Sequence, residues 1–105
     1  MTEMKRYNNG KPQLSYLGDI SEAIYELCKV FEMGAEKYGR NNWKQGGSSS
    51  IILDSLGRHY VKLASGATVD EESGLHHAAH IIWNAAAYIQ LEKENKLNDK
   101  KSIDK

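Results

Sequence analysis

The sequence predicts an all-α fold, a small antiparallel bundle of about three main helices that is completed by oligomerisation. Strand-forming residues are scarce, with three Val and two Thr among 105 residues, whereas Ala, Leu, Glu and Lys are common. Three segments show apolar residues at helical spacing. A chain of this length forms one domain, residues 1–105, and buries only about two thirds of its unfolded surface, so a second subunit is expected to complete the core.

The first helix is predicted over residues 19–38. Residues 1–18 are expected to form an extended lead-in, because the Lys-Pro pair within them favours extended geometry. Asp19 is a suitable N-cap, and Glu22, three residues later, completes a capping-box pattern. Gly39 is a natural stop. The apolar residues that recur at helical spacing are Ile20, Ile24, Leu27, Phe31, Ala35 and Tyr38.

The second helix is predicted over residues 50–64. Ser49 or Ser50 can cap its start, and Gly66 is expected to end it. Asp54 and Arg58 are four residues apart and can pair on the surface of an isolated helix. The apolar face consists of Ile52, Leu56, Tyr60 and Leu63.

The third helix is predicted to start between Asp70 and Ser73 and to continue to about residue 96. Acidic residues at 70–72 favour the positive end of a helix. Residues 75–91 are apolar on nearly every side, which predicts burial on more than one side and again indicates a second subunit. The tail, residues 93–105, is charged and mixed, and is expected to be a frayed, solvated end.

The charge balance excludes a generic polyanion binder. Fourteen basic residues balance fourteen acidic ones, whereas non-specific binding to a nucleic-acid polymer needs an excess of positive charge. No apolar run is long enough to span a membrane, and the first residues do not have the pattern of a secretory signal. The single cysteine, Cys28, cannot form an intramolecular disulfide, so a cytoplasmic location is expected.

Three polar residues interrupt the most apolar helix along one stripe. His77, His80 and Asn84 are spaced i, i+3 and i+7, and burying such groups without partners costs about 1–3 kcal/mol each. His77 and His80 are candidate metal ligands, because imidazoles one turn apart can bind one cation. The alternative is a pair of hydrogen-bonded core histidines. His76 can add a ligand or simply begin the helix.

Other candidate ligands come from the acidic segment and from the second helix. Asp70 and Glu72 occupy alternate positions and would point the same way in an extended loop, over the first turns of the third helix; the alternative is plain helix capping. The second helix offers Asp54, Arg58 and His59, a carboxylate, a guanidinium and an imidazole. The alternatives here are a surface ion pair and a partly buried edge histidine.

The loop around residues 34–46 has the composition of a nucleotide contact. Lys37 can contact phosphate, Trp43 can stack on a planar base, and Tyr38 lies between them in sequence. Asn42 can read hydrogen-bonding edges. The alternative is that the tryptophan closes over the core.

Five segments of the chain have the order and spacing found in a known family. They are Lys11-Pro12, Gly34-Ala35-x-Lys37-Tyr38, Asn42-Trp43-x-x-Gly46, Asp54-x-x-x-Arg58-His59 and Gly66-x-x-x-Asp70-x-Glu72-Ser73-Gly74-Leu75-x-His77-x-x-His80-x-x-x-Asn84-Ala85. Over residues 11–92 the chain resembles the phage family of dATP/dGTP diphosphohydrolases, N-terminal domain. The resemblance implies a helical relative of the MazG-like nucleotide pyrophosphohydrolases, which are oligomeric and cleave a nucleoside triphosphate to monophosphate and pyrophosphate.

The resemblance implies roles for the candidate residues. His77 and His80 would hold a divalent metal with Glu72, Asp54 or His59, and Asp70 is a further candidate ligand. The expected cofactor is Mn²⁺ or Mg²⁺, with Zn²⁺ or Ni²⁺ as alternatives that imidazole also suits. The candidate catalytic residues are Glu72, Asp54, Arg58 and Lys37. The candidate nucleotide-binding residues are Lys37, Tyr38, Asn42, Trp43, Arg58 and Asn84.

Two rival functions remain open at the level of sequence. A small helical oligomer with basic, aromatic loops could bind or sequester a nucleotide signal without cleaving it. A helical adaptor that docks on another protein would need neither the nucleotide nor the histidines.

Overall fold

The computed structural model describes residues 2–7 and 9–99, and within them the chain is helical and forms no β-strand. Three α-helices, α1 (Ser21–Tyr38), α2 (Ser49–Ala64) and α3 (His77–Lys93), are accompanied by two 3-10 helices, η1 (Leu14–Ile20) and η2 (Asn42–Gln45). The predicted all-α class with three main helices is therefore confirmed. None of the helices in this part of the chain is long and apolar enough to cross a membrane.

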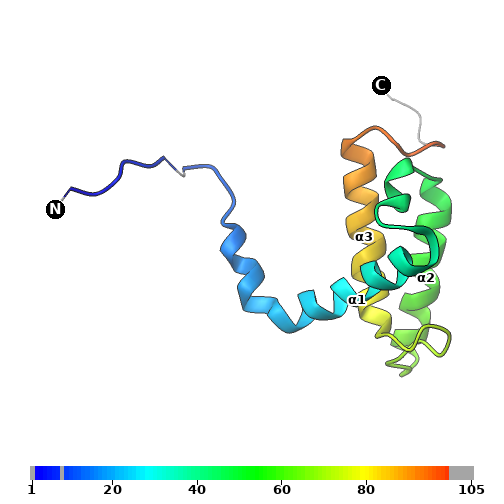
Figure 1. Cartoon of the computed structure of the whole chain (residues 1–105). Coiled ribbons are helices and arrows are strands. Elements are labelled where there is room, and N and C mark those ends of the chain that lie inside the picture. Colours follow the sequence, from blue (N-terminus) through cyan, green and yellow to red (C-terminus); the bar gives the residue numbers. More distant parts are fainter. Residues whose placement is uncertain (1, 8, 100–105) are drawn as a thin grey trace.

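The α2 and α3 helices form an antiparallel hairpin that carries most of the tertiary packing (Figure 1). The second half of α1 crosses this hairpin and packs on α3, whereas η1 and the start of α1 extend away from it as an arm. The molecule is consequently elongated, with extents of 57 × 38 × 29 Å. The antiparallel hairpin brings the last turns of α2 beside the first turns of α3.

The predicted start of the first helix is wrong in detail. Residues 14–18 are not extended but belong to η1, which runs directly into α1. Asp19 lies inside η1 and does not cap α1, whose N-cap is Ile20 and has no side-chain cap. The predicted end is confirmed, because Gly39 adopts a φ of 93° and its N–H donates to the carbonyl of Ala35.

The start of α2 is held by the tail of the chain. Ser48, one residue before the predicted caps, is the N-cap and accepts from the N–H of Ile51. The Asp99 carboxylate accepts hydrogen bonds from the N–H groups of Ser49 and Ser50 and from the hydroxyls of Ser48 and Ser49. A carboxylate at this position satisfies orphan donors and complements the helix dipole.

Up to residue 99 the tail packs at the start of α2, so this part is not the frayed, solvated end that the sequence predicted. Leu97 is buried and forms an isolated parallel bridge with Gly47. This contact closes the molecule at the end where α2 begins and α3 ends (Figure 1). The expectation for the rest of the charged tail, residues 100–105, lies outside the described residues.

The third helix starts later than predicted, because residues 70–75 form a closed loop, and it ends at Lys93, before the predicted residue 96. Asp70 accepts from both the N–H and the hydroxyl of Ser73, a local alternative to helical bonding, and Gly74 has a φ of 76°. His76 then acts as N-cap, its Nδ1 accepting from the N–H of Ala78. Of the two roles considered for His76, the structure gives it that of beginning the helix.

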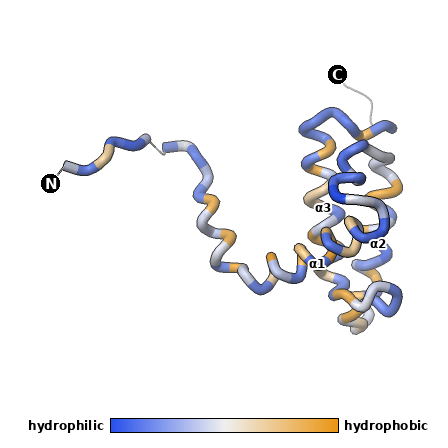
Figure 2. Tube along the Cα trace, viewed as in Figure 1, coloured by the Kyte–Doolittle hydropathy of each residue, from blue (hydrophilic) through white to orange (hydrophobic). Residues whose placement is uncertain are grey.

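The core is small and much apolar surface stays uncovered. The buried apolar side chains among the described residues are Val30, Ala79, Ala87, Leu91 and Leu97. Large apolar side chains are exposed along the arm, including Leu14, Leu17 and Ile20. Figure 2 shows that the arm, away from the hairpin, contains hydrophobic positions. Asp54 and Arg58, which the sequence allows to pair on the second helix, form no ion pair in the described residues.

We expect the variant Asp99→Asn to lower the midpoint of thermal unfolding at pH 7 by a few degrees, because an amide offers one acceptor oxygen and no charge to the start of α2. The hydrogen bonds from Ser48 and Ser49 hold the pKa of Asp99 below its usual value of 3.8. The stabilisation is therefore fully present above about pH 4 and is lost as the pH falls further.

Thermal unfolding followed by circular dichroism at pH 7 and at pH 3 tests this prediction. The difference between the two proteins should be present at pH 7 and shrink at pH 3. Glu71→Gln, which changes an exposed acid in the loop before α3, should unfold like the wild type. Equal midpoints for Asp99→Asn and wild type at pH 7 would contradict the role given to the tail.

Candidate functional site

Three histidines meet between the end of α2 and the start of α3. His59 Nδ1 lies 2.9 Å from His77 Nδ1, and the rings of His59 and His80 stack with their centroids 4.2 Å apart and an interplanar angle of 5°. His77 and His80 are buried, and His59 is half-buried. The hairpin thus unites the His59 of one predicted segment with the His77 and His80 of another.

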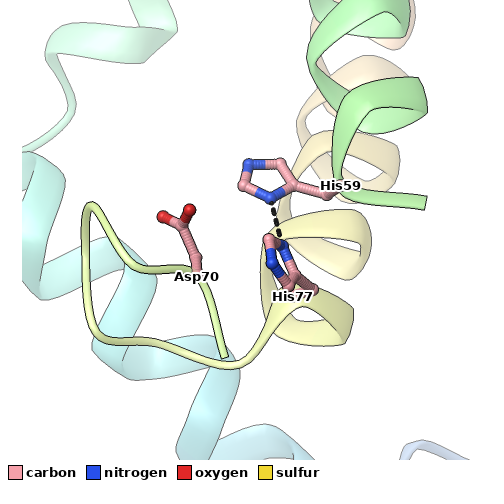
Figure 3. Close-up of side chains that lie close together, drawn as sticks. All are labelled: His59, Asp70 and His77. Carbon is pink, nitrogen blue, oxygen red and sulfur yellow. Dashed lines mark hydrogen bonds between the residues drawn. The ribbon is translucent and has the colours of Figure 1, made fainter. Parts of the chain in front are cut away.

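The loop before α3 adds a carboxylate to this cluster. An isolated antiparallel bridge pairs Val69 with His76, so the intervening residues fold back over the first turn of α3. Asp70 points toward His59 and His77 (Figure 3). Neither alternative for the acidic segment describes Asp70 fully. It lies near the first turn of α3, but in a closed loop and not an extended one, and it does not cap α3, whose N-cap is His76.

Asp70, His59 and His77 form a group that could hold a metal ion. Each offers one donor atom, and the three atoms all lie within 4.8 Å of one another. Imidazole nitrogens and a carboxylate oxygen are common ligands for divalent transition metals. We call these three residues the donor triangle.

His80 supports the donor triangle from the side. The hydroxyl of Ser73 donates to Asp70 Oδ2 over 2.7 Å, and His80 Nε2 lies 2.7 Å from the same hydroxyl, so its N–H donates to Ser73. His80 Nε2 is 3.7 Å from Asp70 Oδ2. This chain of contacts holds the aspartate in place and engages the nitrogen of His80 that faces it.

Burial lowers the pKa of two histidines in the cluster, and hydrogen bonds lower the pKa of its carboxylate. Burial lowers the pKa of His59, against the raising effect of Asp70, and the pKa of His80 is lowered by burial and by His59. Burial alone would raise the pKa of Asp70, but the hydrogen bonds from Ser73 hold it below its ordinary value. Neutral imidazoles and an ionised carboxylate are the states that coordinate metals.

A cavity of about 720 Å³ opens beside the cluster, between α1, η2 and α3. His80 lines it, so the cavity and the histidine cluster share a wall. Four of the predicted nucleotide-binding residues line it as well: Tyr38, Asn42, Trp43 and Asn84. Its size is within the range of small-molecule sites, about 300–1,000 Å³.

Four other predicted site residues lie apart from these groups. Lys37, Asp54, Arg58 and Glu72 are exposed, and none of them lines the cavity or belongs to the donor triangle. Glu72 still acts on the cluster through space, because its charge raises the pKa of His59, whereas Arg58 lowers it.

Sequence reasoning missed three residues. Ser73, which links Asp70 to His80, was treated only as a boundary of the third helix. Phe31 was assigned to the apolar face of the first helix, and Trp83 to the buried third helix, yet both line the cavity with Trp43. A usable signal was the position of Trp83, which directly precedes Asn84 on the polar stripe.

Comparisons with known proteins agree with the resemblance. The model of the family described as dATP/dGTP diphosphohydrolase, N-terminal, matches residues 1–101. A dATP/dGTP diphosphohydrolase of Salmonella phage PMBT28 is 40% identical over 80 residues, which make up 76% of this chain and 26% of that protein. The match thus covers only a minor part of the relative. No solved structure matches the chain.

The free energy of unfolding of the metal-free protein should fall as the pH drops below about 6.5, the usual pKa of histidine. Because the folded pKa values of His59 and His80 are lowered, the unfolded chain binds more protons in this range and is favoured there. Urea denaturation with EDTA at pH 7.5 and pH 5.5 measures the difference. A stability that stays constant or rises on acidification would contradict the burial of neutral imidazoles.

Proposed function

The chain belongs to the family described as dATP/dGTP diphosphohydrolase, N-terminal, and on that premise we propose that it is a metal-dependent nucleoside triphosphate pyrophosphohydrolase. The proposed substrates are dATP and dGTP. Water attacks the α-phosphorus, the bond from that phosphorus to the bridging oxygen breaks, and a deoxynucleoside monophosphate and pyrophosphate are released. The observation that carries this proposal is a donor triangle for a cation beside a cavity of nucleotide size.

The donor set fits a divalent cation. The Nδ1 atoms of His59 and His77 are 2.9 Å apart, and two ligands at right angles on a cation with bonds of about 2.1 Å lie about 3 Å from each other. We propose Mn²⁺ or Mg²⁺ as the ion; two imidazoles suit Mn²⁺, Zn²⁺ and Ni²⁺ better than Mg²⁺. When bound, the cation would supply activation of water and shielding of phosphate charge.

His80 is assigned a different role from the one its sequence suggested. Its Nε2 is engaged by Ser73 and its ring stacks on His59. It is therefore a positioning residue, which orients Asp70 and His59, in place of a direct ligand. Mutation of such a supporting residue typically lowers metal affinity or activity by about 10–100-fold.

The exposed charged residues are proposed to act on the triphosphate from outside the cluster. Arg58 is adjacent to His59 on α2, and Lys37 lies in the last turn of α1. Either cation would neutralise charge that builds up on the phosphate oxygens. Glu72, in the same loop as Asp70, is the proposed further carboxylate. Asp54 is the weaker candidate, because it is exposed on α2 and lies outside the donor triangle.

We also propose that the chain self-associates through its arm. Leu14, Leu17 and Ile20 are 76%, 53% and 52% exposed, and the arm contacts little beyond α1. Soluble monomers rarely leave contiguous apolar surface of this kind uncovered. A nucleotide-hydrolysing protein of this size would meet its substrate in the host cytoplasm, which we propose as its location.

A second function is favoured by one observation. The match covers only 26% of the related phage protein, so that protein's activity can depend on parts outside the matched region. In that case this chain would bind the nucleotide in its cavity and release it intact. The two functions differ in whether nucleotide recovered from the complex has been cleaved.

The purified chain should convert dGTP to dGMP and pyrophosphate when Mn²⁺ is supplied, and EDTA should abolish the reaction. His59→Ala and His77→Ala should each lower the rate by at least about 100-fold, because each removes a metal ligand. His76→Asn, which keeps a good N-cap next to the cluster, should retain activity. Chromatographic detection of dGMP, with enzymatic detection of pyrophosphate, measures the rates. Absence of turnover with every divalent metal and nucleotide tested would overturn the catalytic proposal.

Size-exclusion chromatography with light scattering should give a mass of more than one chain for the wild type. The double variant Leu17→Glu, Ile20→Glu should shift the mass to that of a single chain, because the charges oppose burial of the arm. The double variant Lys5→Glu, Arg6→Glu, in the exposed residues before the arm, is the control and should not. A wild type that is monomeric at all concentrations would refute self-association.

A further inference from the structure

The cavity beside the histidine cluster has an aromatic wall built by three separate elements. Phe31 of α1, Trp43 of η2 and Trp83 of α3 approach one another edge-on, with ring centroids 5.9 to 6.1 Å apart. Phe31 is 37% exposed, so this aromatic group is not sealed within the core. Aromatic surfaces of this kind offer faces or edges on which a planar heterocycle can pack.

Asn84 Oδ1 has no hydrogen-bond donor within the described part of the chain. Asn84 is only 5% exposed and lines the cavity next to Trp83. Its amide nitrogen donates to the carbonyl of His80 over 2.8 Å, which fixes the orientation of the amide and leaves Oδ1 as an acceptor. No donor to Oδ1 is found in residues 2–7 and 9–99. A buried acceptor without a donor is unfavourable unless a ligand or water supplies one.

We propose that this cavity binds the base of the nucleotide and that Asn84 Oδ1 accepts a hydrogen bond from an N–H group on the base edge. Phe31, Trp43 and Trp83 supply the apolar contact. Adenine offers its 6-amino group, and guanine its ring N–H and 2-amino group. The inference rests on the proposed function only in taking a nucleotide as the ligand, and it does not require that the nucleotide be cleaved.

The position of the cavity agrees with this assignment. His80 lines the cavity and also stacks on His59, one of the proposed ligands. A base seated at the aromatic wall would therefore have its phosphates on the side of the donor triangle. The buried acceptor also distinguishes this cavity from a purely apolar contact for another helix, because an apolar side chain would leave Oδ1 unsatisfied.

The two tryptophans of the chain, Trp43 and Trp83, both line this cavity, so intrinsic fluorescence reports its occupancy directly. The full-length protein is titrated with dAMP in EDTA, which excludes metal-dependent chemistry. We expect saturable quenching. The analogue of dAMP that lacks the 6-amino group should bind at least about 10-fold more weakly, because it leaves Oδ1 unpaired.

The variant Asn84→Leu should bind dAMP and this analogue with equal affinity. Gln90→Leu, which makes the same amide-to-leucine change at an exposed position of α3, should keep the wild-type preference. The comparison of the two ligands on wild-type protein holds even if Asn84→Leu does not fold. The preference requires no hydrolysis, so it can be present when the catalytic proposal fails.

Three results would overturn the inference. The first is equal binding of dAMP and the analogue by the wild type, and the second is an unchanged preference in Asn84→Leu. The third is tryptophan emission that ignores both ligands but changes with protein concentration, which would mean that a subunit contact covers the cavity. Hydrolysis of dATP together with either of the first two results would leave the proposed function standing and remove only the role of Asn84. Hydrolysis together with the third result would remove the whole base site in this cavity.

Discussion

The approach of two imidazole nitrogens across the α2–α3 hairpin is the contact around which the rest of the site is organised. His59 and His77 can lie 2.9 Å apart only because the hairpin is antiparallel and pairs the end of α2 with the start of α3. To hold a cation, both Nδ1 atoms must be unprotonated and offer their lone pairs. Without a cation, one Nδ1 carries a proton and donates a hydrogen bond to the other. The same packing places His80 and Asn84 in the wall of the cavity, so the proposed metal site and the proposed base site have one structural origin.

The ends of the hairpin are fixed by short, polar contacts. At one end, Asp99 caps α2 and Leu97 pairs with Gly47. At the other end, Asp70 and Ser73 close the loop before α3 and hold the carboxylate against the histidines. The apolar core between these ends is small, and the apolar arm is uncovered. For these two reasons we expect the folded unit to be an assembly.

The sequence predicted the helices well and their boundaries less well. Apolar periodicity gave all three segments, and Gly39 ends α1 as expected. Asp19 is a residue type that often caps helices. It does not cap α1, because it lies inside a 3-10 helix that continues into α1. The charge of residues 70–72 favours a helix start. The bonds of Ser73 to Asp70 and the bridge of Val69 to His76 close a loop there instead, and charge alone predicts neither of them.

The candidate site was predictable in kind but not in pairing. The polar stripe on α3 identified His77, His80 and Asn84, and the polar residues of the second helix and of the acidic segment identified His59 and Asp70. Which carboxylate faces the cluster depends on how the loop closes, so Asp70 and Glu72 could not be separated beforehand. Phe31 and Trp83 were hidden for a related reason, since residues at helical spacing look like core until the neighbouring elements leave a cavity between them.

The most direct test of the central claim is a crystal grown with Mn²⁺ and measured for anomalous scattering. The account predicts a peak within bonding distance of the Nδ1 atoms of His59 and His77 and of an Asp70 carboxylate oxygen. A map without a peak there, in which His59 and His77 are hydrogen-bonded to each other while Mn²⁺ is saturating, would contradict it.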